Sequence, residues 1–253
     1  SVRGTIAGGD RRREPIVSGL GGPASARRAG STDRPRPLFS RFYACVGPRM
    51  EAEGMAELRD ELLADLTGTV VEVGCGNGLN FAHYPSGVRE VIAVEPEPRL
   101  RALATRAAES AEVPVRVLPG VANRLPVESA GADAAVLCLV MCSLDDRPGA
   151  LEELRRVLRP GGALHFLEHT IAEEALLRTV QRLADATVWP LLTGGCHTAT
   201  DPAGLIREAG FTIIRHRRLR FPERRITMPA TPHVLGVARL EPGGRPDHDG
   251  QDA

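Results

Sequence analysis

A glycine-rich loop and two acidic residues stand out as a candidate ligand site in the first half of the sequence. The glycines follow the apolar run 70–73 and are Gly74, Gly76 and Gly78. Glycine lets a backbone turn sharply and come into contact with a ligand. Glu72 precedes the loop, and Glu95 follows the next apolar run, where an acid can accept hydrogen bonds from both hydroxyls of a ribose. The pattern predicts a nucleoside-binding site, although a tight turn that binds nothing is an alternative for the loop taken alone.

The spacing of the glycines distinguishes two classes of ligand. Nicotinamide and flavin enzymes carry Gly-x-Gly-x-x-Gly, and the helix that follows binds a pyrophosphate. Here the third glycine comes one residue early, and Leu79 stands at the fingerprint position. Glu72 would also bring a negative charge close to any phosphate. S-adenosylmethionine (SAM) has an ammonium, a sulfonium and an adenosine but no phosphate, so it fits better, with Glu72 helping to hold its amino-acid end.

Two histidines and a cysteine are candidates for residues that bind or deprotonate a methyl acceptor. Methyl transfer from a sulfonium is an in-line displacement, to which alignment can contribute about 7–11 kcal/mol. A thiol acceptor reacts as its thiolate, and His169 is the candidate base, with a hydrogen-bonded rim histidine as the alternative. His197 is a second candidate, in a loop turn. Cys142 lies where the acceptor is expected, with inert packing as the alternative.

Composition excludes several other chemistries. All 32 basic residues are arginine, so no lysine is present for a Schiff base or a phosphate-binding loop. The 5 cysteines contain no Cys-x-x-Cys pair, so we predict neither a disulfide scaffold nor a metal site. The net charge of zero gives no global argument for nucleic acid. The basic run 215–225 is interpreted as a solvated surface, with an RNA site as the alternative.

Alternating helices and strands must position these residues. Apolar runs predict seven strands, over 70–73, 88–94, 113–118, 132–139, 163–167, 211–215 and 233–240. Helical patterns cover 50–66, 97–108, 147–158 and 203–209, and a helix-rich insert covers 172–192. Asp185 and Trp189 of the insert are expected to shape a lid over the acceptor. Strands separated by helices imply a Rossmann-like, doubly wound α/β fold, mostly parallel, that binds its ligand beyond the carboxyl ends of the strands.

The two ends of the chain differ from the region between them. Residues 1–36 are rich in Gly, Arg, Ser and Pro and are predicted to be a disordered basic tail, and residues 242–253 a second disordered tail. Residues 37–241 then form one domain. No apolar run reaches the roughly 18–20 residues that span a bilayer, and no signal peptide is recognised, so a cytoplasmic location is expected.

Several motifs together resemble those of the class I SAM-dependent methyltransferases. They are 72–78, Glu95, 120–126 (GVANRLP) and 154–162 (LRRVLRPGG). Within that class the chain is similar to the branch that includes quinone-biosynthesis enzymes, and most similar to the methyltransferase-like group that methylates alkyl thiols. That likeness lies in the local stretches 78–85, 139–143, 168–169 and 195–196. The similarity runs from about Phe39 to Leu240.

The resemblance implies a role for each matching residue. It implies a seven-stranded sheet with an antiparallel last strand. The glycine loop would contact the methionine part of SAM, Glu95 the ribose, and the backbone of Ala122 and Asn123 the adenine, while Leu139 lines the methionine pocket. Cys75 and Pro96 complete the predicted cofactor set.

The chain departs from these relatives in two places. Many members have an aspartate that bonds the adenine amino group where this chain has Val121, so Asn123 or a backbone carbonyl would have to substitute. The animal relatives carry an apolar anchor where this chain has its basic tail, so no stable membrane anchor is predicted. The expected function is methyl transfer to a small molecule, such as an alkyl thiol, with no nucleic-acid partner. The alternatives are a quinone-like or other oxygen, nitrogen or carbon acceptor, and a non-catalytic SAM-binding partner protein.

Overall fold

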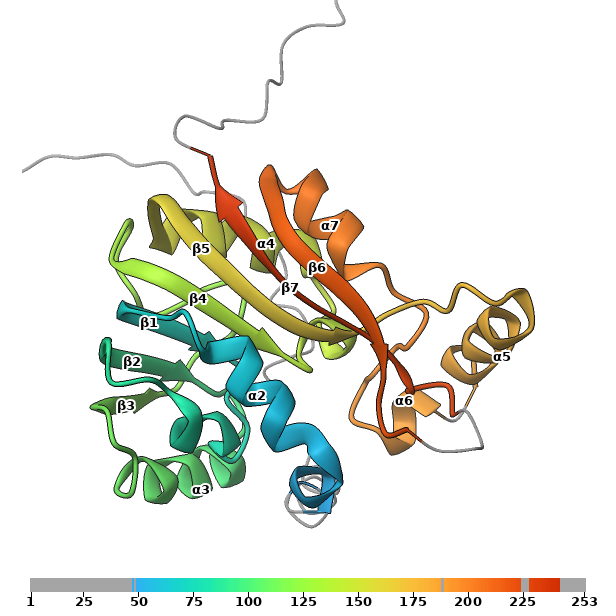
Figure 1. Cartoon of the computed structure of the whole chain (residues 1–253), viewed down its shortest axis with the longest axis horizontal. Helices are drawn as coiled ribbons and strands as arrows, with labels where there is room; N and C mark the ends of the chain where they lie inside the picture. Colours follow the sequence, from blue (N-terminus) through green and yellow to red (C-terminus); the bar gives the residue numbers. More distant parts are fainter. Residues whose placement is uncertain (1–46, 48, 188, 224–227, 242–253) are drawn as a thin grey trace, which may run out of the picture.

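Seven strands form one sheet in the order β3-β2-β1-β4-β5-β7-β6 (Figure 1). The computed structural model describes residues 47, 49–187, 189–223 and 228–241. The strands are β1 (Gly68–Val73), β2 (Val88–Val94), β3 (Val115–Leu118), β4 (Ala132–Cys138), β5 (Leu158–His169), β6 (Phe211–Arg220) and β7 (Pro232–Leu240). The α-helices are α2 (Ala56–Leu63), α3 (Pro98–Ala108), α4 (Arg147–Val157), α5 (Ala175–Asp185), α6 (Trp189–Leu192) and α7 (Pro202–Glu208). Shorter helices are η2 (Glu51–Met55), η3 (Leu79–His83) and η4 (Met141–Ser143).

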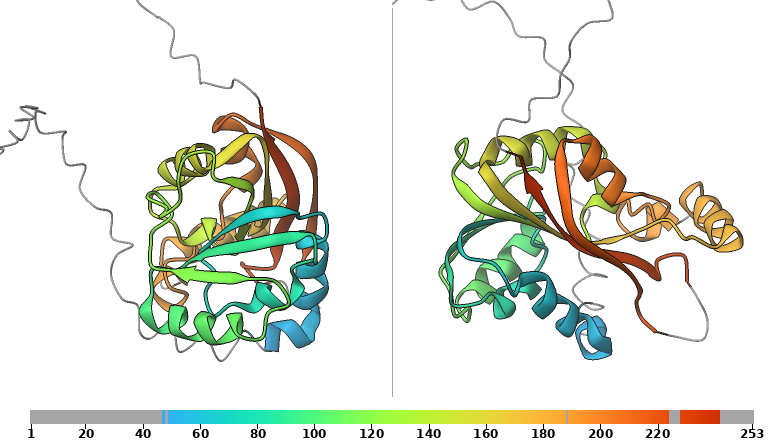
Figure 2. Two further views of the ribbon diagram at one scale, coloured as in Figure 1. Left: turned by 90° about the vertical axis from the view of Figure 1, so that its left-hand side faces the viewer. Right: turned by 45° about the horizontal axis from the view of Figure 1, so that its top comes forward.

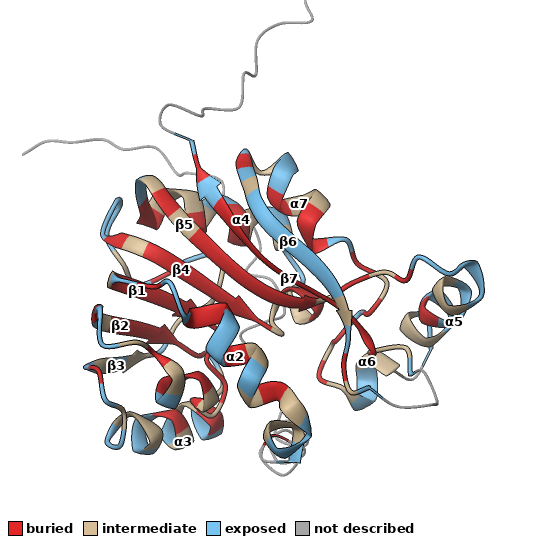
Figure 3. Ribbon diagram, in the orientation of Figure 1, coloured by how far each residue is buried: buried red, intermediate tan, exposed pale blue. Residues whose placement is uncertain are grey.

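Helices cover both faces of the sheet, which explains why its central strands are mostly apolar and buried (Figure 3). Successive side chains of a strand point to opposite faces. Val71 therefore packs in one core cluster with residues of α4 and α7, such as Leu154 and Ile206. Val70 packs in the other cluster with residues of α2 and α3, such as Leu62 and Ala104. The predicted doubly wound α/β fold is confirmed.

The order of the strands reverses at β1, and this places the glycine loop. β1 pairs in parallel with β2 on one side and with β4 on the other. Val73, the last residue of β1, is level with Val94 of β2 and with Leu137 of β4. The three strands thus end at one edge, where the crevice of an open α/β sheet binds its ligand.

The last strand of the chain lies between two others and runs against them. β7 is antiparallel to β5 on one side and to β6 on the other. Because of this direction β7 begins at the edge where β5 ends, and His233 is in register with His169. The antiparallel last strand implied by the resemblance is confirmed.

Three predicted boundaries were wrong. The helix expected over 50–66 is divided into η2 and α2, because Gly54 has a φ of 110°. The stretch 159–162, expected to be a break between helix and strand, is a bulge inside β5, where the register with β4 shifts between Ala132 and Ala134. β6 runs on to Arg220, beyond the predicted end at 215. The predicted tails, 1–36 and 242–253, lie outside the described residues.

Acidic residues of neighbouring helices and loops pair with the arginines of β6. Arg217 bonds to Glu61 of α2, and Arg215 lies 2.6 Å from Asp65. Beyond them the guanidiniums of Arg218 and Arg220 lie 3.3 and 3.6 Å from Glu173 and Glu174. Four arginines of the basic run are thus ion-paired, and the interpretation of the run as a solvated surface stays a prediction. Across the described residues, no helix is both long and apolar enough to cross a membrane.

Candidate cofactor and acceptor site

The three glycines of the loop all adopt a backbone conformation that other residues rarely take. Their φ angles are 67° for Gly74, 58° for Gly76 and 84° for Gly78. A Cβ atom on Gly74 would lie 2.8 Å from Cγ2 of Val140, in the segment after β4. The loop needs glycine at position 74 for its conformation and also to let the segment after β4 approach so closely.

The carboxylate of Glu95 is tied to this loop from the end of β2. One oxygen accepts a hydrogen bond from the Gly76 N–H, and the other from the Glu97 N–H, both at 2.9 Å. Glu95 is 5% exposed, and its burial raises its pKa to about 7 despite these two bonds. Each oxygen keeps a free lone pair, so the side chain can accept hydroxyl donors while it supports the loop. The next residue, Pro96, is exposed.

A second buried carboxylate, Glu72, lies behind the loop and already has partners. Its two oxygens accept hydrogen bonds from Asn80 Nδ2 and the Tyr84 hydroxyl, each at 2.8 Å. Burial raises the pKa of Glu72 to about 7, and Arg59 acts in the opposite direction. Arg59 donates to the side-chain oxygen of Asn80 and to Cys138 Sγ. Any contact of Glu72 with a ligand would therefore have to use the remaining lone pairs of its carboxylate and its charge.

Sequence reasoning missed Arg59. This guanidinium is 4% exposed and sits on the apolar side of α2, one helical turn after Met55. One signal in the sequence could have identified it. Arg59 stands at a position where the helical period predicts an apolar residue, and buried arginines are rare unless they are paired.

The other residues of the predicted cofactor set follow the ends of neighbouring strands. Cys75 is buried within the loop, and Ala122 and Asn123 come after β3, half-buried and exposed respectively. Leu139 follows β4 with a φ of 60°, an uncommon value for leucine, and its N–H donates to the Leu167 carbonyl at 2.8 Å. The structure thus gathers the whole set along one edge of the sheet. The roles of the individual residues remain predictions.

Two features of this edge fit SAM. The side-chain oxygen of Asn77, in the glycine loop, is buried and has no hydrogen-bond partner among the described residues. A buried acceptor without a partner is costly, and an ammonium or hydroxyl donor on a ligand would satisfy it. The two carboxylates, Glu72 and Glu95, suit a ligand that carries positive charge and a ribose, and they oppose a phosphate.

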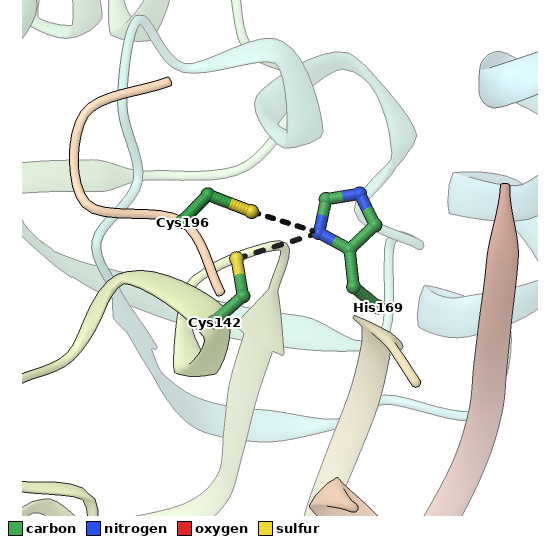
Figure 4. Close-up of side chains that lie close together, drawn as sticks. All are labelled: Cys142, His169 and Cys196. Atoms are coloured by element: carbon green, nitrogen blue, oxygen red, sulfur yellow. Dashed lines mark hydrogen bonds between the residues drawn. The ribbon is translucent and has the colours of Figure 1, made fainter. Parts of the chain in front are cut away.

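Three side chains that could act on an acceptor meet beyond β4 and β5 (Figure 4). His169 is the last residue of β5, Cys142 lies in η4, and Cys196 lies in the loop after α6. Nδ1 of His169 is 3.4 Å from Cys142 Sγ and 3.5 Å from Cys196 Sγ. Both cysteines are buried, and both sulfur atoms point at the same ring nitrogen. His197 does not join them, because its side chain is exposed and its Nδ1 is bonded to the Gly195 carbonyl.

Polar side chains hold the segments that carry this cluster. The carboxylate of Glu168 accepts bonds from the Val140 and Met141 N–H groups, at 2.9 and 3.1 Å, and so fixes the start of η4. Asp185 accepts from the Thr198 and Ala199 N–H groups, each at 2.8 Å, and so fixes the loop after Cys196. Both α5 and α6 lie beyond the carboxyl ends of the parallel strands (Figure 2). The predicted lid position of Asp185 and Trp189 is consistent with this.

The pKa shifts in the cluster oppose one another. The pKa of Cys142 is raised well above its ordinary value, because Cys196 bonds to it and burial disfavours the thiolate. Burial lowers the pKa of His169, but the charges of Cys142 and Glu168 outweigh it and leave the pKa raised. An imidazolium here would need a thiolate beside it, and that thiolate is the costly species. The Cys142 thiol is therefore held in its neutral form beside His169.

Comparison with known proteins identifies the family. The model of a family described as a methyltransferase domain matches residues 71–166. The chain is 33% identical over 213 residues to the thiol S-methyltransferase TMT1B of Mus musculus, covering 80% of this chain and 86% of that protein. It is 30% identical over 197 residues to the thiol S-methyltransferase TMT1A of Homo sapiens, covering 74% of this chain and 80% of that protein.

The solved structures agree on the fold. A SAM-dependent methyltransferase of Thermotoga maritima superposes with a TM-score of 0.59 at 24% identity, covering 81% of this chain and 99% of that one. The chain belongs to the SAM-dependent methyltransferases, and SAM is its cofactor.

Proposed function

We propose that this chain transfers the methyl group of SAM to the sulfur atom of a small thiol. The observation that carries the proposal is the cluster of Cys142, His169 and Cys196, a polarizable sulfur and nitrogen surface beyond the ends of β4 and β5. The cluster lies close to the cofactor edge, because Val140, two residues before Cys142, packs against Gly74 of the glycine loop. The names of the two relatives, both thiol S-methyltransferases, support the same class of acceptor.

The proposed chemistry divides the work between two groups of residues. SAM supplies an electrophilic methyl group when it is bound. The glycine loop, Glu72, Glu95 and the segments around Ala122, Asn123 and Leu139 hold the donor in one orientation. The acceptor side must then favour the thiolate form of the substrate and align its sulfur with the methyl group, since alignment can contribute about 7–11 kcal/mol to such a displacement.

His169 is the catalytic residue of this proposal. Its Nδ1 already faces the two cysteines, which leaves Nε2 as the ring atom for an acceptor. A role as general base therefore stays a prediction, and Asp185 stays a positioning residue that fixes the loop beside Cys196. A cytoplasmic location likewise stays a prediction.

The test is a screen for release of S-adenosylhomocysteine with purified protein. Alkyl thiols and hydrosulfide are compared with phenols, amines and quinone precursors, and a Glu95→Gln variant controls for background hydrolysis of SAM. We expect product with thiols only. Product with quinone precursors or phenols alone would overturn the thiol proposal. Calorimetric binding of SAM without turnover of any acceptor would instead support the non-catalytic alternative.

A further inference from the structure

We propose that Cys142, His169 and Cys196 bind one zinc ion and leave its fourth coordination position open to the acceptor thiol. The metal site itself stands on the geometry of the three side chains. Only the use of the open position rests on the proposed thiol methyltransferase activity.

The distances in the cluster match the edges of a zinc tetrahedron. Bonds of about 2.3 Å to sulfur and 2.0–2.1 Å to nitrogen at tetrahedral angles require nitrogen–sulfur separations of about 3.6 Å and a sulfur–sulfur separation of about 3.8 Å. The two nitrogen–sulfur separations are 3.4 and 3.5 Å. All three ligand atoms lie within 4.8 Å of one another, so the sulfur atoms need to close by at most about 1 Å.

Hydrogen bonding can use Nδ1 of His169 for only one of the two thiols. Nδ1 of a neutral imidazole is either one acceptor or one donor, whereas two thiols point at it. The Cys142 thiol has other partners, the Leu139 carbonyl at 3.8 Å and Ser143 Oγ at 3.6 Å, so Nδ1 is not needed to satisfy it. A cation at the centre of the triangle would contact both sulfur atoms and the nitrogen at once.

The donor set favours zinc over harder ions. Two thiolates and one imidazole are the ligands of borderline-soft cations, whereas Mg²⁺ and Ca²⁺ prefer oxygen. Three protein ligands plus an open position are typical of catalytic zinc, whereas structural zinc sites use four. The described residues at the cluster include no fourth ligand in the metal-binding group. The site is therefore of the open kind.

The ligands are held by three separate parts of the fold. Glu168 fixes the backbone before Cys142, and Asp185 fixes the backbone after Cys196. The ring of His169 packs against the ring of His233 on β7, with centroids 4.6 Å apart. Such support fixes ligand orientation, which metal sites require.

An open coordination position on zinc would bind the acceptor thiol and favour its thiolate form. A coordinating thiol is deprotonated outright, with its proton passing to water. A lone pair of the bound sulfur then forms a bond to the methyl carbon, while the bond from that carbon to the sulfonium breaks and its electron pair stays on the departing thioether. The thiolate and the sulfonium give two neutral thioethers, so charge balances. A thioether binds zinc more weakly than a thiolate, which favours release of the product.

The first experiment measures metal directly in the full chain. Protein produced in zinc-supplemented medium is analysed for metal content, and the variants are Cys142→Ser, Cys196→Ser and His169→Asn. Cys138→Ala is the matched control, since Cys138 is also a buried free cysteine but lies outside the cluster. We expect about one zinc per chain in the wild type and the control, and loss of zinc in the three cluster variants. Absence of bound metal in the wild type, or retention of it in the variants, overturns the site.

A second measurement separates zinc from a disulfide. Thiols are counted in denatured protein before and after chelation and reduction. Zinc binding predicts that Cys142 and Cys196 react with a thiol reagent once zinc is removed, without a reductant. Recovery of both thiols only after reduction shows a disulfide between them and overturns the zinc site.

A third measurement tests the open position apart from turnover. Cobalt is substituted for zinc, and its visible spectrum is followed as an alkyl thiol is added. A new sulfur-to-cobalt band supports coordination of the acceptor, and an unchanged spectrum overturns it. If metal and band are present but no S-adenosylhomocysteine is released with any thiol, the site stands and the proposed function fails. If product forms at an unchanged rate after chelation, the function stands and the role of the metal fails.

Discussion

The carboxylate of Glu95 accepts a hydrogen bond from the backbone N–H of Gly76 at 2.9 Å. The acid expected to hold the ribose is thus also a support of the loop expected to hold the methionine part. With these roles, binding of the ribose would be coupled to the conformation of the loop under the methionine part. A substitution at Glu95 acts on both.

We expect Glu95→Gln to weaken SAM binding strongly. The amide keeps the size of the side chain, but its NH₂ group cannot accept from both Gly76 and Glu97 as the carboxylate does. Hydrogen bonds to a charged group contribute about 1.5–3 kcal/mol each, so the Kd for SAM should rise about 10- to 100-fold. Calorimetry with SAM measures it, with Glu90→Gln, on the strand that precedes Glu95, as the control. A Kd within twofold of wild type contradicts the assignment.

We expect Gly74→Ala to lower stability more than Gly161→Ala does. Both glycines have positive φ, 67° and 78°, which costs an alanine about 1–2 kcal/mol. At Gly161 nothing lies within 4 Å of the added methyl, whereas at Gly74 it meets Val140 at 2.8 Å. Overpacking adds about 1–3 kcal/mol to the loss in the free energy of unfolding. Urea denaturation of the two variants compares them, and equal losses would show that the contact with Val140 relaxes without cost.

We expect SAM binding to release protons below neutral pH, and Glu72→Gln to remove part of that release. The pKa of Glu72 in the folded protein is about 7, raised from 4.5 mainly by burial. The neutral acid is therefore the stable form at low pH, and its contribution to stability is lost as pH rises through about 7. A cationic ligand favours the carboxylate and lowers this pKa, so affinity should rise with pH over the same range. Calorimetry in buffers of different ionisation enthalpy counts the protons. An unchanged count in Glu72→Gln contradicts the role.

We expect Asp185→Ala to impair turnover and to leave SAM binding intact. The substitution removes the acceptor of the Thr198 and Ala199 N–H groups, next to Cys196. Displacement of a reacting group by about 1 Å can cost about 100-fold in rate, so kcat with a thiol should fall while the Kd for SAM stays unchanged. Asp201→Ala is the control, because Asp201 only caps α7 through the Gly204 N–H, and its loss should cost about 1 kcal/mol of stability. Equal effects on kcat would show that Asp185 acts through general stability.

The sheet and the cofactor loop could be predicted because their signals are local. An apolar run followed by alternating glycines indicates a strand and a sharp turn without reference to the rest of the chain. The N-cap residues of α3 and α7, Glu97 and Asp201, likewise come directly before the helices that they cap. The bulge in β5 could not be predicted, because a Pro-Gly-Gly stretch indicates a break in any context. Only the pairing with β4 shows that the strand resumes on both sides of it.

The cluster could not be predicted from spacing. Successive members of the cluster stand 27 residues apart, with Cys142 in η4, His169 at the end of β5 and Cys196 in the loop after α6, and no short motif joins them. The stretches around all three contributed to the family resemblance, but only the fold shows that their side chains meet. Our expectation that the chain has no metal site was based on local Cys-x-x-Cys spacing, which is blind to ligands that distant segments bring together. It stays a prediction, and the zinc proposal opposes it.

The position of β7 between β5 and β6 affects the order in which the molecule can be completed. Until β7 is synthesised, β5 and β6 cannot be joined in the sheet. The backbone groups of each that pair with β7 in the folded protein have no strand to pair with. The ring of His233 contacts that of His169 only when β7 has paired with β5. A nascent chain on the ribosome would therefore carry the complete glycine loop long before its acceptor side is assembled, and would acquire its finished chemistry with almost the last residues of the domain.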